Sequence, residues 1–181
     1  MRDRFESGLT FDELLHTVRK NKELWNDVYS RAQAPEDIVA AVRELTGHWH
    51  LLALSEDWCG DAVNLLPVLA RLAEQADNID LRILSRDENP DLMDAHLTEG
   101  RSRSIPVVMA LDADFQERGW WGPRPAPLQD WVTREGLALE SGPRYREIRR
   151  YYARDKGRTF LAEIVALLQK AKRVDLLASS G

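Results

Sequence analysis

The chain has 181 residues, of which 44% are hydrophobic and 30% charged, so it is long enough for one domain with a sizeable core. Its formal net charge of −5 gives no reason to expect a nucleic-acid partner. Because the N-terminal residues lack the apolar run of a secretory signal and the longest apolar runs, residues 51–54 and 107–111, are far too short to cross a bilayer, we expect a cytoplasmic protein with no membrane partner.

A helical extension is predicted over residues 1–34. Thr10 and Glu13 have the spacing of a capping box, in which a hydroxyl and a carboxylate satisfy each other's free N–H groups at a helix start. Trp25 and Val28 belong to a second stretch with helical spacing of apolar residues.

From residue 35 onward, helical and strand patterns alternate. A helix with Pro35 in its first turn is predicted to end at Gly47. Short apolar stretches predict strands, and amphipathic stretches predict helices. The strands are predicted over residues 48–55, around 79–83, over 105–111 and around 116–121, and the helices over 60–76 and from Asn89-Pro90 to residue 97.

The proline-punctuated segment 123–127 is followed by two or three further helices, one of which carries Phe160 and Ile164. Together these elements predict an α/β fold with a central mixed sheet of four to five strands and helices on both faces.

The chain contains one cysteine and four histidines. A single cysteine cannot form an internal disulfide, and the four histidines show no paired ligand spacing, so we predict no metal and no cofactor. Each histidine is interpreted as a surface or internally satisfied side chain: His16, His48, His50 and His96.

The sequence Trp58-Cys59-Gly60-Asp61-Ala62 lies between a predicted strand and a predicted helix. A cysteine in the first turn of a helix meets unpaired N–H groups and the helix dipole, which stabilise the nucleophilic thiolate. The carboxylate of Asp61 opposes this effect, so we expect only a modest lowering of the Cys59 pKa.

This motif resembles the W-C-G-P-C active site of the thioredoxin family. Pro67, eight residues after Cys59, matches the proline of the family's active-site helix, and Ile105-Pro106 matches its cis-proline loop. The resemblance covers residues 36–121 and is nearest to bacterial thioredoxin-like proteins with a W-C-G-D motif. It implies a single thioredoxin-like domain, with residues 1–34 as an extension and residues 35–175 as the core.

Two departures from the family pattern bear on activity. Ala62 stands where the resolving cysteine is expected, and Ala53 stands where the resemblance places a buried acid that deprotonates that cysteine. The second cysteine normally releases the substrate by attacking the mixed disulfide. The resemblance therefore implies monothiol exchange through Cys59, with a protein or a low-molecular-weight thiol or disulfide as substrate and an external thiol as resolver.

The predicted site consists of Cys59 as the catalytic residue and five substrate-binding residues: Trp58, Gly60, Asp61, Ile105 and Pro106. In the resembled fold, the backbone of Ile105 pairs with an extended substrate segment. This interpretation requires the sulfur of Cys59 to be exposed to solvent beside the Ile105–Pro106 turn.

Each of these features also has a purely structural interpretation. Cys59 can be a small packing residue, Asp61 a helix cap, and Trp120 and Trp121 core side chains. The surplus of Lys and Arg over residues 143–173 can attract an anionic thiol such as glutathione, but a solvated helix face is the preferred interpretation.

Two functional hypotheses from different classes follow. One is monothiol exchange through Cys59, and the other is a redox-inactive binding module that holds an extended peptide at Pro106. A one-cysteine peroxidase ranks below both, because Ser55 and Glu56 occupy positions where such sites place other residues. The sequence predicts no oligomeric state.

Overall fold

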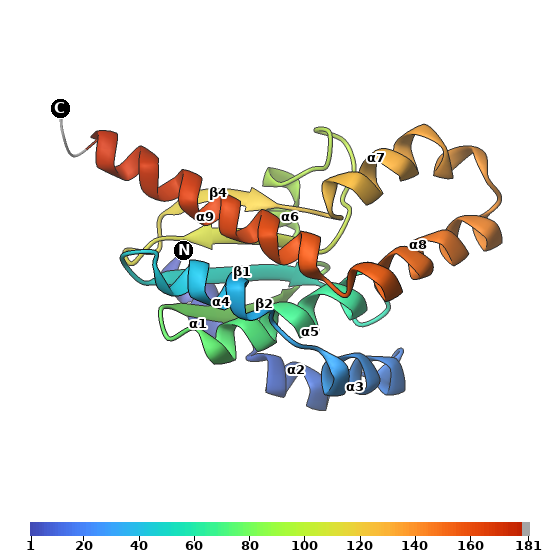
Figure 1. The fold of residues 1–181 in the computed structure, drawn as a ribbon, viewed down its shortest axis with the longest axis horizontal. Helices are drawn as coiled ribbons and strands as arrows, with labels where there is room; N and C mark the ends of the chain where they lie inside the picture. The colour runs from blue at the N-terminus through green and yellow to red at the C-terminus, as the bar shows by residue number, and fades with distance from the viewer. Residues whose placement is uncertain (179–181) are drawn as a thin grey trace.

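A mixed β-sheet forms the centre of the protein. The structure is a computed structural model that describes residues 1–178. The strands are β1 (Trp49–Ser55), β2 (Ile79–Ser85), β3 (Val107–Leu111) and β4 (Glu117–Trp121). They lie in the order β2-β1-β3-β4 (Figure 1), with β1 parallel to β2 and antiparallel to β3, and β3 antiparallel to β4. The predicted mixed α/β fold is confirmed, with four strands among the described residues.

The two central strands are the most apolar. Every residue of β1 and β3 is buried, as continuous apolar sequence predicts for strands covered on both faces. The edge strand β2 has a different pattern, in which exposed Asp80 stands between buried Ile79 and Leu81. The isolated bridge between Leu9 and Ile83 covers part of this edge with the N-terminal segment.

Helices cover both faces of the sheet. On one face, α4 (Glu36–Arg43) and α5 (Gly60–Gln75) pack against α9 (Arg158–Ala178), which crosses in front of the sheet in Figure 1. On the other face lie α1 (Arg2–Ser7) and α6 (Pro90–Ala95). Arg4 of α1 donates hydrogen bonds to Asn89, the N-cap of α6, and to Asp91.

Neighbouring tryptophans of β4 show the two layers directly. Trp120 makes an edge contact with His96, which follows α6, whereas Trp121 packs on Phe160 of α9. Successive side chains of a strand point to opposite faces. Both indoles are partly buried against the core, which agrees with their structural interpretation.

The N-terminal extension is helical, as predicted, with α2 (Phe11–Thr17) and α3 (Lys22–Arg31). The capping box of Thr10 and Glu13 is present, and Trp25 is fully buried, so the extension shares the core. Several predicted boundaries differ from the structure: the strand predicted over 105–111 begins at Val107, and the helix predicted to reach residue 97 ends at Ala95. Pro35 is the N-cap of α4 rather than a first-turn residue, and α4 ends at Arg43, before Gly47.

The C-terminal part contains α7 (Ala126–Arg134), a 3-10 turn (Gly136–Ala138), α8 (Ser141–Asp155) and α9. The chain turns between α8 and α9 at Lys156 and Gly157, which both have positive φ. Part of the basic surplus is neutralised locally, because Arg150 pairs with Glu147 and Arg158 with Asp37. Within the described part of the chain, no helix has both the length and the apolar character that crossing a bilayer requires.

Candidate functional site

Cys59 lies where β1 leads into α5. It is the N-cap of α5, and its sulfur accepts a hydrogen bond from the Ala62 amide at 3.5 Å. On the other side, the thiol donates to the carbonyl oxygen of Ile105 at 3.4 Å. The Ile105–Pro106 peptide bond is cis. The structure therefore brings Cys59 and the Ile105–Pro106 turn together, although they are 46 residues apart.

The sulfur is not exposed, which corrects the expectation from the sequence. Cys59 is 6% exposed. The pKa of its thiol is raised from 9.0 to about 11, chiefly by burial and also by the nearby Asp61 charge, against the opposite effects of the Ala62 and Asp61 amides and the Arg124 charge. The predicted modest lowering of the Cys59 pKa is therefore wrong, because loss of hydration outweighs the favourable helix start. At neutral pH Cys59 is a protonated thiol.

Asp61 forms the centre of a buried polar cluster. It is 8% exposed. Its carboxylate pairs with Nη2 of Arg124 at 2.6 Å and accepts a hydrogen bond from the Tyr152 hydroxyl at 2.7 Å. Asp61 therefore faces the interior and does more than cap the helix.

Arg124 and Tyr152 were absent from the predicted site. Arg124 lies in the proline-rich segment after β4, and Tyr152 comes from α8, 91 residues after Asp61. Burial and the Asp61 charge raise the pKa of Tyr152, so its hydroxyl keeps its proton and acts as a donor. The one available signal was an arginine between two prolines, and it carried no information about its partner.

The rim of the site is formed by Trp58 and Gly60. Trp58 is 41% exposed and Gly60 is also exposed. The Arg86 guanidinium lies 4.9 Å from the centre of the Trp58 ring, and it donates to the Arg103 carbonyl oxygen at 3.3 Å. Arg86 thus connects Trp58 to the loop that precedes Pro106.

The loop that leads into Cys59 is fixed by side-chain hydrogen bonds from both flanks. Oδ2 of Asp57 accepts from the amides of Arg19 and Lys20 at 3.0 and 2.9 Å, and its carbonyl oxygen accepts from the Trp25 indole at 3.0 Å. Glu56 accepts from the Ser85 hydroxyl at 2.8 Å. The N-terminal extension therefore supports the site.

A close backbone approach fixes the Pro106 turn. Gly122 has φ of +153°, and a Cβ atom at this position would lie 2.5 Å from the carbonyl oxygen of Pro106. Only glycine fits this contact without displacement of the chain. The Gly122–Pro123 bond is the second cis peptide bond among the described residues.

The chemistry available to Cys59 is restricted. Position 53 holds a fully buried alanine instead of an acid, and position 62 holds a fully buried alanine instead of a second cysteine. Cys59 is also the only cysteine of the chain. Release of a mixed disulfide would therefore need a thiol from outside the chain.

Two solved structures have a similar fold. The crystal structure of a protein of unknown function from Pseudomonas aeruginosa is similar, with a TM-score of 0.75, 21% identity and coverage of 94% of this chain and 97% of that one. An HIV epitope scaffold is similar with a TM-score of 0.73, 19% identity and coverage of 93% and 96%. No functionally curated protein matches the chain.

The sequence itself matches a family model described as thioredoxin over residues 8–137. This range includes the Cys59 loop, the Ile105–Pro106 turn and all four described strands. The chain therefore belongs to the thioredoxin family.

Proposed function

We propose that this protein is a redox-inactive, thioredoxin-fold binding module that holds an extended peptide beside Trp58 and the Ile105–Pro106 turn. The observation that supports this proposal best is the state of Cys59, whose buried, protonated thiol donates to the Ile105 carbonyl oxygen. A thiol is a poor nucleophile compared with a thiolate. In this role Cys59 fixes the turn, and the reducing environment of the cytoplasm keeps it free.

The rim of the site has features that suit an extended peptide. Trp58 offers a large exposed ring, and the unsubstituted backbone at Gly60 leaves open space beside it, since a Cβ atom there would have no neighbour within 4 Å. Among the described residues, none accepts a hydrogen bond from the amide of Ile105. Such an amide is a natural partner for the backbone of an added strand.

The test begins with selection of peptides that bind the protein from a random library under reducing conditions. The affinity of one selected peptide is then measured for the wild-type protein and for its variants. We expect C59S to bind with the same affinity as the wild type, because the serine hydroxyl can replace the thiol as the donor to the Ile105 carbonyl oxygen. W58A should bind at least about tenfold more weakly, as expected for an aromatic anchor. Y145A, which removes another exposed aromatic on α8, is the matched control. Equal binding by W58A and the wild type would contradict the proposal.

Monothiol exchange is a second candidate, which the position of Cys59 at the N-cap of α5 favours. In this reaction the Cys59 thiolate attacks a disulfide, forms a mixed disulfide and expels one thiolate, and an external thiol then attacks the mixed disulfide and restores Cys59. The raised pKa of Cys59 makes the attacking thiolate rare at neutral pH.

The two candidates differ in their dependence on Cys59. Exchange predicts a covalent Cys59 adduct with glutathione disulfide, seen by mass spectrometry and reversed by a reductant. The binding module predicts unmodified Cys59 after the same treatment and unchanged peptide binding by C59S.

A further inference from the structure

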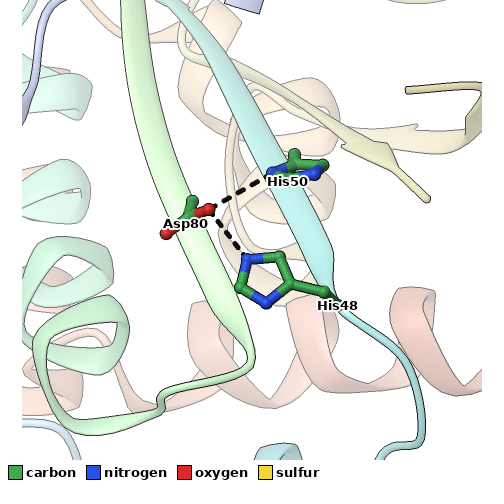
Figure 2. Close-up of side chains that lie close together, drawn as sticks. All are labelled: His48, His50 and Asp80. Atoms are coloured by element: carbon green, nitrogen blue, oxygen red, sulfur yellow. Dashed lines mark hydrogen bonds and ion pairs between the residues drawn. The ribbon is translucent and has the colours of Figure 1, made fainter. Parts of the chain in front are cut away.

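Two histidines and one aspartate meet at the end of the sheet opposite Cys59. His48 immediately precedes β1, His50 lies within it, and Asp80 is the partner of His50 in the parallel register of β1 and β2. Residues two apart in an extended chain project to the same side, so His48 and His50 both reach Asp80. Figure 2 shows the two imidazoles on one side of the Asp80 carboxylate.

The spacing of histidines and cysteines along the sequence does not reveal this cluster. The third group, Asp80, comes from the next strand, 32 residues after His48. Only the register of β1 and β2 brings it into the cluster.

The donor atoms have the spacing of metal ligands. Nε2 of His48 lies 2.8 Å from Oδ2 of Asp80, and Nδ1 of His50 lies 3.3 Å from the same oxygen. One donor atom from each of the three residues lies within 4.8 Å of the others. Around a tetrahedral zinc ion with Zn–N distances of about 2.0–2.1 Å, neighbouring ligand atoms are roughly 3.3 Å apart. Small side-chain rotations therefore suffice to enclose an ion.

His50 supplies the second, independent observation. The residue is 9% exposed, and its Nδ1 atom is buried; the contact of this atom with Oδ2 of Asp80 at 3.3 Å is within ion-pair distance but does not have the geometry of a hydrogen bond. The ring stacks on Phe115 at 4.0 Å between centroids and also touches Phe5. Burial and, to a smaller extent, His48 lower the pKa of His50 against the pull of Asp80. Its unpartnered nitrogen is aimed at the carboxylate, where a cation would satisfy both groups.

One charge opposes a cation here. Arg2 lies over the Phe115 ring at 4.1 Å and acts electrostatically on His50. The carboxylate of Asp80 offsets it. Because the side chains of His48 and Asp80 are 40% and 53% exposed, an ion would keep at least one position open to solvent.

We propose that His48, His50 and Asp80 form a binding site for a divalent transition-metal ion, with zinc as the best match. Two imidazoles and one carboxylate are donors that suit zinc, copper, nickel and ferrous iron rather than calcium or magnesium. The ion connects the first residues of β1 and β2. This site is independent of the peptide-binding proposal, because it lies at the other end of β1 from Cys59.

The experiment is calorimetric titration of the untagged protein with Zn²⁺, because a polyhistidine tag binds the same ions. We expect one ion per chain for the wild type and for C59S, which excludes the lone thiol as the ligand. H48Q and D80N alter half-exposed side chains and leave the core intact. They should bind at least about tenfold more weakly, since even outer-shell partners of a metal contribute roughly 10–100-fold.

H16Q is the matched control, because His16 is an exposed histidine that also lies near an aspartate, Asp12, at 3.7 Å. It should bind as the wild type does. A second readout is thermal unfolding, whose midpoint should rise with Zn²⁺ in the wild type but not in D80N. The proposal is overturned if the wild type binds no stoichiometric ion, if binding is lost in C59S, or if D80N retains the wild-type affinity.

Discussion

At the scale of single residues, the properties of Cys59 result from two opposing effects. The amides at the start of α5 stabilise a thiolate, whereas burial beside the Ile105–Pro106 turn removes the water that a thiolate needs. Burial dominates, and the result is a thiol whose pKa is about 11. The same residue type at the same helix position can therefore be reactive or inert, depending on its exposure.

The raised pKa of Cys59 predicts a specific loss of stability in alkali. Between the ordinary value of 9.0 and the folded value of about 11, the unfolded chain releases the thiol proton while the folded chain retains it. The unfolding free energy of the wild type should therefore fall by about 3 kcal/mol across this range as pH rises. Denaturant unfolding of the wild type and C59S at matched pH measures the difference. Parallel pH profiles for the two proteins would contradict the assignment.

D61N tests the buried ion pair with Arg124, whose side chains are 10% and 19% exposed. An asparagine oxygen can still accept from Tyr152, but it leaves the Arg124 charge buried without a counter-ion. We expect a loss of about 3 kcal/mol in unfolding free energy by urea denaturation. D27N, which removes the exposed Asp27–Arg31 pair, should change it by less than about 1 kcal/mol. Similar losses of unfolding free energy in the two variants would show that the buried Asp61–Arg124 pair stabilises the fold no more than an exposed pair does.

At the scale of elements, the site depends on segments outside the sheet. The loop before Cys59 is held by amides and an indole of the N-terminal extension, and the Pro106 turn is held by the backbone after β4. Neither support is part of the central β-α-β unit. Substitutions in these segments should therefore change the accessibility of Cys59 although the substituted residues do not contact it.

D57A removes the acceptor for the Arg19 and Lys20 amides. We expect unfolding free energy to fall by about 1–2 kcal/mol, and hydrogen exchange at these two amides to accelerate. The alkylation of Cys59 should also become faster, because the loop that encloses it is released. D130A, on the exposed side of α7, is the control. Unchanged exchange in D57A would show that the extension does not hold the loop.

G122A places a Cβ atom 2.5 Å from the Pro106 carbonyl oxygen, on a backbone with φ of +153°. Backbone atoms cannot move aside as a flexible side chain can, so we expect a loss of at least about 3 kcal/mol in unfolding free energy. G142A is the matched control, because a Cβ atom there meets nothing within 4 Å and the residue lies in α8. It should be neutral or slightly stabilising. Equal stability of the two variants would contradict the close approach.

At the scale of the whole molecule, most of the fold could be predicted from the sequence, because local sequence patterns indicate its main strands and helices. Hydrophobic runs predict β1 and β3, the capping box predicts the start of α2, and the thioredoxin-like spacing predicts the contact of Cys59 with the Ile105–Pro106 turn. These features depend on residues close in sequence or on a known spacing.

The interior of the site could not be predicted in the same way. Contacts such as Asp61 with Arg124 and Tyr152 join segments far apart in the chain, and no local pattern records them. The same holds for His50 and Asp80, which only strand register brings together. Exposure is also a property of the assembled molecule, which is why the accessibility of Cys59 was misjudged.

The central claim is that Cys59 is an enclosed, protonated thiol, and its rate of alkylation as a function of pH tests this most directly. A small neutral alkylating reagent should modify Cys59 much more slowly than free cysteine at neutral pH, and the rate should rise with pH with its midpoint at about 11. A rate that reaches its plateau with a midpoint at or below the ordinary value of 9.0 would contradict the account and favour monothiol exchange.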